Sequence, residues 1–78
     1  MDDINVDKKK IKQDRFKRIA ERRTKKILND MRLLSNCSNK INYEYTDEEV
    51  NKIFSTLEHS LKLAKDKFVG NKQIEFTL

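Results

Sequence analysis

The sequence predicts an all-α fold: a hairpin of two helices that dimerises into a four-helix bundle, with a short C-terminal strand or extended tail. Two segments repeat apolar residues with the period of a helix. A stretch rich in Ser and Asn separates them, and the chain has no proline to interrupt either segment. Only 36% of the 78 residues are hydrophobic, so a single chain has little material for a core.

The first predicted helix spans about residues 8–34 and opens a helical hairpin domain of residues 8–69. Its apolar positions recur at intervals of three, four and seven residues, which places them in one narrow stripe. Arg23 falls near the middle of that stripe, so it must either extend to solvent or meet a carboxylate of another element. We expect residues 1–7, ahead of the helix, to form a flexible N-terminus. The first apolar stripe consists of Phe16, Ala20, Ile27, Met31 and Leu34, with Ile19 at its edge.

A capping box begins the second predicted helix, which spans residues 47–69. Thr46 occupies the N-cap and Glu49 the N3 position, and apolar residues stand at the two staple positions around them. Gly70 suits the C′ position, where a left-handed residue closes many helices. The second apolar stripe consists of Val50, Ile53, Phe54, Leu57, Leu61, Ala64 and Phe68.

The C-terminal segment, residues 70–78, alternates apolar and polar side chains, which is typical of a strand or an extended tail. A lone strand must pair with another chain or stay flexible. A hairpin leaves part of each apolar stripe uncovered, and a single cysteine excludes an internal disulfide that would compensate. We therefore expect a homodimer in which two chains bury their stripes together.

Positive charge is concentrated in the first helix. The formal net charge of the chain is +5, and residues 8–26 alone carry 11 basic and two acidic residues. Such density attracts polyanions, although lysine on a solvated helix face is the alternative interpretation. The basic side chains lie opposite the first apolar stripe, and Asn29 beside them is a candidate reader of DNA base edges. DNA and RNA fit equally well. The predicted nucleic-acid-binding residues are Arg15, Arg18, Arg22, Lys25, Lys26, Asn29 and Arg32.

The polar stretch between the helices is a second candidate site. Its asparagines donate and accept hydrogen bonds, and its tyrosine rings can stack on bases. The alternative is that the asparagines satisfy backbone groups of the turn. The residues considered for recognition are Asn36, Asn39, Asn42 and Tyr43.

Other function classes find little support. His59 and its helical neighbours point in different directions and form no triad. Cys37 has no residue placed to act as its base, and the chain has no cluster of metal ligands. We therefore expect no enzyme, no cofactor and no metal. No apolar run approaches the length of a membrane span, which predicts a cytoplasmic protein without membrane contact.

The run Glu21-Arg22-Arg23-Thr24-Lys25-Lys26-Ile27, followed by helix, loop and helix, resembles the basic helix-loop-helix transcription factors. In that family a Glu and several Arg read the major groove from a dimeric bundle. Thr24 departs from its consecutive arginines, and the capping box and Asn-rich loop are not its hallmarks. The resemblance therefore implies only an arrangement, a dimer whose basic helices project toward DNA.

A second segment, residues 32–46, reads R-L-x-x-N-x-x-N followed by N-Y-x-Y-T. It resembles small uncharacterised helical proteins of phages, plasmids and related mobile elements. That family has no assigned activity, so the resemblance implies a mobile-element setting. The expected function is a small basic nucleic-acid-binding protein of a phage or plasmid, regulatory or accessory in role. The alternative is an interaction protein that binds and inhibits a host defence complex.

Overall fold

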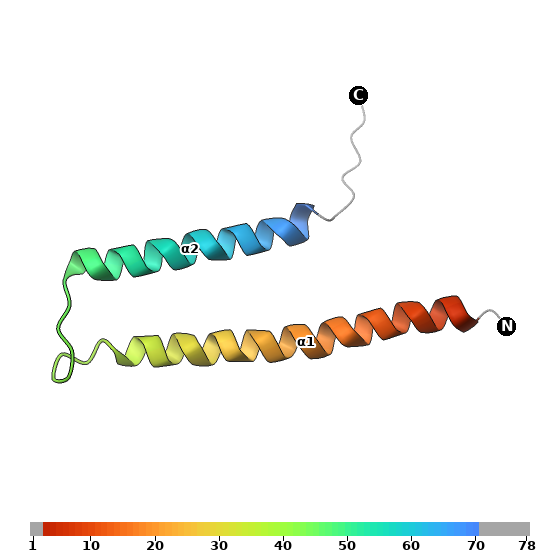
Figure 1. Cartoon of the computed structure of the whole chain (residues 1–78), viewed down its shortest axis with the longest axis horizontal. Coiled ribbons are helices and arrows are strands. Elements are labelled where there is room, and N and C mark those ends of the chain that lie inside the picture. The colour runs from red at the N-terminus through yellow and green to blue at the C-terminus, as the bar shows by residue number, and fades with distance from the viewer. Residues whose placement is uncertain (1–2, 71–78) are drawn as a thin grey trace, which may run out of the picture. The chain divides into compact units, whose positions relative to one another are not determined.

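The computed structural model describes residues 3–70, with side chains from residue 7 onward, and this part of the chain contains two helices (Figure 1). Helix α1 spans Asp3–Asn36 and helix α2 spans Asp47–Gly70. No strand occurs in this range, so the prediction of an all-α fold is confirmed for it. The strand or tail expected in residues 71–78 lies outside the described residues.

The chain divides into two units, Met1–Tyr43 and Glu44–Leu78, which are described separately. The first unit holds α1 and the turn after it, and the second holds α2. Between residues 3 and 70, neither helix combines the length and the apolar character that crossing a bilayer requires.

Helix α1 begins earlier than predicted, at Asp3 instead of about residue 8. Residues 3–7, assigned from the sequence to a flexible N-terminus, are therefore helical. The reason is that this stretch contains neither proline nor glycine, so no residue opposes extension of the helix toward the N-terminus. As a consequence, the lysines from residue 8 to residue 12 lie well inside a helix.

A series of 3₁₀-type turns ends α1. The backbone N–H groups of Cys37, Ser38 and Asn39 each donate to the carbonyl oxygen three residues earlier, at 2.9, 3.1 and 3.3 Å. The Ser35 hydroxyl also donates to the Arg32 carbonyl, at 2.7 Å. These bonds satisfy carbonyl groups that the end of a helix leaves without partners. No described residue has a positive φ, so this turn does not need glycine.

The predicted capping box of α2 is confirmed. The Thr46 N–H donates to Oε1 of Glu49 at 2.8 Å, and the Glu49 N–H donates to Oγ1 of Thr46 at 3.1 Å. Both backbone donors lack partners within the helix, so each side chain satisfies one of them. Tyr45 and Val50, at the staple positions, are both half-buried. The start of α2 is thus determined locally, by four consecutive positions and the residues flanking them.

The end of α2 differs from the prediction. Gly70, the last described residue, is helical, whereas the sequence placed a left-handed C′ glycine there. Its φ is not positive, and a Cβ atom added to it would contact nothing within 4 Å. The backbone can therefore continue in helical geometry through this position, and the special freedom of glycine is not used here.

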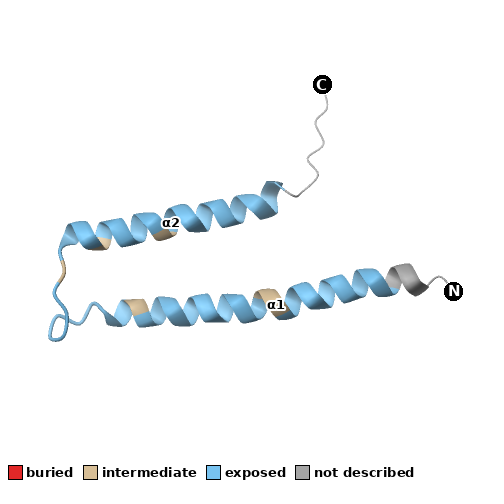
Figure 2. Ribbon diagram, in the orientation of Figure 1, coloured by how far each residue is buried: buried red, intermediate tan, exposed pale blue. Residues whose placement is uncertain are grey.

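Both apolar stripes remain accessible. No described residue of either unit is buried (Figure 2). In α1, Ile19, Ala20 and Leu34 are half-buried, whereas Ile27 is 60% exposed. In α2, Phe68 is 62% exposed. Exposed apolar surface of this extent is typical of a helix face that contacts another protein surface.

Candidate nucleic-acid interface

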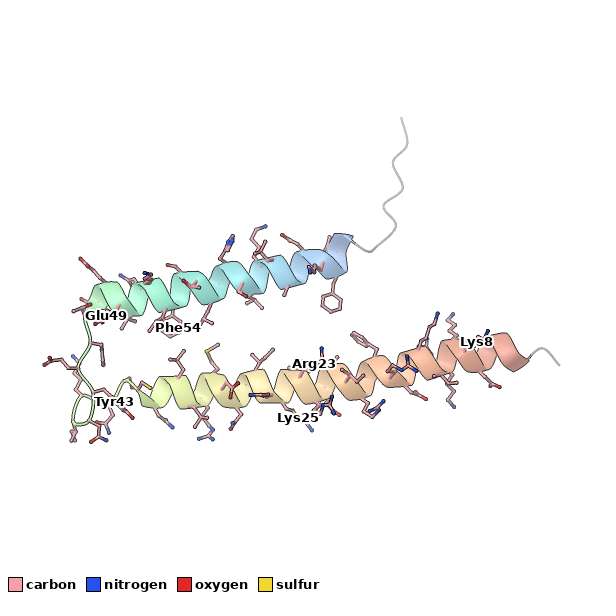
Figure 3. The ribbon with its side chains drawn as sticks, in the orientation of Figure 1. Lys8, Arg23, Lys25, Tyr43, Glu49 and Phe54 are labelled. Atoms are coloured by element: carbon pink, nitrogen blue, oxygen red, sulfur yellow. The ribbon has the colours of Figure 1, made fainter. Side chains whose placement is uncertain are left out.

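The structure places all seven predicted nucleic-acid-binding residues on α1, and all of them are exposed. Figure 3 shows Lys25 and Arg23 on opposite sides of the helix. This is the separation that a spacing of about 100° per residue predicts for a basic face opposite an apolar stripe. The helix therefore presents its predicted cations to solvent on one face. We call these seven residues the basic face: Arg15, Arg18, Arg22, Lys25, Lys26, Asn29 and Arg32.

Acidic neighbours partly neutralise one stretch of the basic face. Nζ of Lys26 lies 3.0 Å from Oδ2 of Asp30, and Nζ of Lys25 lies 3.9 Å from Oε1 of Glu21. All four side chains are largely exposed, so these pairs contribute little stability. Their effect is instead to lower the net charge around Lys25 and Lys26.

The other cations of the basic face have no such neutralisation. Within residues 7–70, Arg15, Arg18 and Arg22 form no ion pair and no side-chain hydrogen bond. A guanidinium group is always charged and offers five N–H donors, which suits it to phosphate oxygens. These three arginines are therefore the strongest candidates for contacts with a polyanion.

Asn29 and Arg32 form a pair on the basic face. Nη2 of Arg32 donates a hydrogen bond to Oδ1 of Asn29 at 2.9 Å. The bond joins residues three positions apart, which are neighbours on a helix surface. The proposed base reader thus already uses its amide oxygen to hold an arginine.

Arg23 is exposed, although the sequence places it among the positions of the first apolar stripe. Within the described residues of the first unit, Arg23 forms no ion pair, so a carboxylate of another element stays a prediction beside extension to solvent. Its guanidinium group interrupts the stripe between Ala20 and Ile27. A partner that covers this stripe must therefore accommodate a positive charge.

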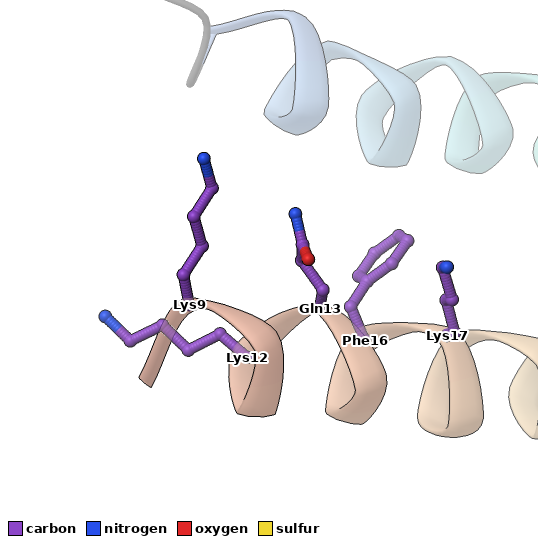
Figure 4. Close-up of a pocket in the computed structure, with 5 residues that line it drawn as sticks. All are labelled: Lys9, Lys12, Gln13, Phe16 and Lys17. Carbon is purple, nitrogen blue, oxygen red and sulfur yellow. The ribbon is translucent and has the colours of Figure 1, made fainter. Parts of the chain in front are cut away.

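A group of lysines around Phe16 is not among the predicted site residues, because most of them precede the first strong apolar position of the helix. Lys9, Lys12 and Lys17 surround Phe16 and, with Gln13, line an open hollow of about 390 Å³ (Figure 4). No carboxylate lines it. The sequence contains no proline or glycine between Asp3 and this group, which could have indicated that these lysines lie on the helix.

In the polar stretch, Asn39 has a clear structural role. Its Oδ1 accepts the Ile41 N–H at 2.9 Å, and its carbonyl accepts the N–H groups of Asn42 and Tyr43 at 3.2 and 2.9 Å. This agrees with the interpretation that the asparagines satisfy turn backbone. Asn36 contributes its carbonyl to the same turn. All four predicted loop residues are exposed.

The turn also exposes an apolar side chain that was not predicted to be part of a site. Ile41 is 92% exposed, and Tyr43 nearby is 52% exposed. The only signal in the sequence was an isoleucine in an otherwise polar stretch. Both side chains extend from a turn that backbone hydrogen bonds hold in place.

The residues considered for catalysis are both exposed, Cys37 in the turn and His59 on α2. The Cys37 thiol lies 3.9 Å from the Leu33 carbonyl oxygen, a weak contact within the end of the helix. Among residues 7–70, no three His, Cys, Asp or Glu side chains are grouped so as to hold a metal ion.

The chain matches no protein-family model, and no curated protein or solved structure shows significant similarity to it.

Proposed function

We propose that this chain is a small basic nucleic-acid-binding protein with a regulatory or accessory role in a phage or plasmid. The observation that carries the proposal is the row of un-neutralised arginines, Arg15, Arg18 and Arg22, along one exposed face of α1. Phosphate contacts release counterions and supply affinity without regard to base sequence. The mobile-element setting depends on the resemblance of residues 32–46 alone.

The proposal includes a homodimer. We infer that α1 and α2 form a hairpin and that two hairpins associate in a four-helix bundle. The support is the exposure of both stripes, exemplified by Ile27 at 60% and Phe68 at 62%. In such a bundle the basic faces point outward, and two copies double the number of phosphate contacts.

A gel-shift panel of duplex DNA, single strands and structured RNA at two salt concentrations tests nucleic-acid binding. The parent should bind, and affinity should fall steeply with salt. A variant that replaces four cations of the basic face by alanine should bind weakly while keeping its helical circular dichroism. Its substitutions are Arg18→Ala, Arg22→Ala, Lys25→Ala and Lys26→Ala.

The matched control removes the same charge from α2 through Lys52→Ala, Lys62→Ala, Lys65→Ala and Lys67→Ala. We expect this control to keep most of the affinity, because its cations are not part of the basic face. Equal reductions in affinity for both variants would mean that net charge alone attracts the nucleic acid. A parent that binds nothing at low salt would refute the proposal.

The second candidate function is inhibition of a host defence complex by a protein–protein contact. Ile41, 92% exposed on a turn that hydrogen bonds hold in place, is the observation that favours it. Apolar and aromatic anchors dominate protein interfaces. This function predicts that Ile41→Asp, Tyr43→Ala, Asn36→Ala or Asn39→Ala abolishes the activity, with weak dependence on salt. The basic-face variant would then be active.

A further inference from the structure

Residues 8–18 of α1 carry seven basic side chains and a single acidic one, Asp14. All of these residues are helical and exposed. Because α1 begins at Asp3, the lysines at the start of this segment are held at fixed angles around a helix axis. We call residues 8–18 the basic segment.

The cations of the basic segment surround the helix. At about 100° per residue, Lys9 and Arg18 lie on opposite sides of the axis, and Lys10 and Lys12 are also nearly opposite. Figure 4 shows Lys9, Lys12 and Lys17 around Phe16, which belongs to the apolar stripe. The cations from Arg22 to Arg32, apart from Arg23, instead keep to the basic face. The basic segment therefore differs in kind from the rest of α1.

The basic segment also keeps its charge. Within residues 7–70, none of its lysines or arginines forms an ion pair, whereas Lys25 and Lys26 both do. Burying this segment against an apolar partner on the side of Phe16 would bring Lys9 and Lys12 close to that partner and force their charged ends to extend to solvent. Such a segment is suited to surroundings that are negative on two sides.

We infer that the basic segment enters the major groove of duplex DNA, where cations on opposite sides of the helix contact phosphates of both strands. This inference rests on the proposed function. The major groove is about 12 Å wide and admits an α-helix. A single strand offers one line of phosphates and would use one side of the helix. The major groove of A-form RNA is too deep and narrow for side chains to read.

The test removes the cations on the side away from the basic face, through Lys9→Gln, Lys12→Gln and Lys17→Gln. Glutamine is a good helix former, so helical circular dichroism should be unchanged. The salt slope of duplex DNA binding, log K against log salt, should become shallower by about 0.9 for each phosphate that the variant no longer neutralises. Arginine at the same three positions should restore it. The charge-matched control carries Lys52→Gln, Lys65→Gln and Lys67→Gln on α2 and should keep the parent slope.

The results of these binding measurements separate the major-groove inference from the proposed function. A parent slope in the Lys9, Lys12 and Lys17 variant means that the basic face binds alone, which overturns the inference and leaves the proposed function standing. Tighter binding of the parent to single strands or structured RNA than to duplex DNA of equal length also overturns it. The inference is also contradicted if the variant with glutamine at residues 9, 12 and 17 loses helical structure and the variant with arginine at the same positions does not recover binding. A parent that binds no nucleic acid refutes both proposals.

Discussion

Arg32 and Asn29 are joined side chain to side chain on α1, with Nη2 of the arginine donating to Oδ1 of the asparagine at 2.9 Å. An asparagine reads adenine by accepting a hydrogen bond from the N6 amino group of the base and donating one to its ring nitrogen N7. Arg32 competes for the acceptor that such base recognition requires. The pair is better suited to a role in which Asn29 orients an arginine toward phosphate.

Asn29→Ala should therefore weaken duplex binding by less than about 1 kcal/mol, since an exposed hydrogen bond contributes little net free energy. The reduction should be the same for every sequence, because the proposed contact of Arg32 is with phosphate, which is the same in every duplex. Fluorescence anisotropy with a panel of duplexes that differ in adenine content measures this. A reduction confined to adenine-containing sites would show that Asn29 reads bases.

Thr46→Ala should lower the free energy of unfolding by about 1 kcal/mol, because it removes the side-chain acceptor of the Glu49 N–H. Thermal unfolding followed by circular dichroism measures the change. Thr56→Ala is the control. The Thr56 hydroxyl donates to the Lys52 carbonyl inside α2, where it caps nothing, and alanine has the higher helix propensity. This variant should therefore not lower the melting temperature. If both variants melt at the parent temperature, the cap has no energetic role.

Phe54→Asp or Leu57→Asp should dissociate the dimer and reduce helicity, because each places a charge within the second apolar stripe. Sedimentation at tens of micromolar and circular dichroism record the two effects. Leu63 is the matched position, since it is an exposed leucine of α2 outside the stripe. Leu63→Asp should leave the dimer intact. A fully helical parent monomer would contradict the proposed association.

Gly70→Ala should not destabilise the protein and should raise the free energy of unfolding by up to about 1 kcal/mol. Gly70 is helical without a positive φ, and an added Cβ contacts nothing within 4 Å. Thermal unfolding measures the effect. A lower melting temperature would instead indicate the left-handed cap that the sequence suggested.

The features that could be predicted from the sequence are those encoded by neighbouring residues. The start of α2 followed from Thr46 and Glu49, because a capping box is a pattern of four positions whose hydrogen bonds need nothing from the rest of the chain. The start of α1 was predicted too late, because Asp3 is followed by neither a capping box nor a regular apolar stripe. Helix ends defined only by the absence of a breaker are difficult to locate.

The candidate site could likewise be predicted only where neighbouring residues in the sequence encode it. The basic face followed from periodicity, but its neutralisation at Lys25 and Lys26 depends on rotamers that bring Glu21 and Asp30 within reach. The exposure of Ile41 depends on the turn geometry that Asn39 fixes. The proposed burial of the apolar stripes depends on contacts between elements far apart in the sequence or in different chains, and no local pattern specifies such contacts.

The hydrogen bonds and ion pairs described above all join residues at most four positions apart. Structure built from such local contacts forms quickly, since helix–coil relaxation takes about 0.1–1 μs for a peptide of some 20 residues. For the proposed dimer, the slow event in folding is then the encounter of two chains. Refolding after dilution from denaturant should accordingly show an early phase independent of concentration and a later phase whose rate rises with the amount of protein.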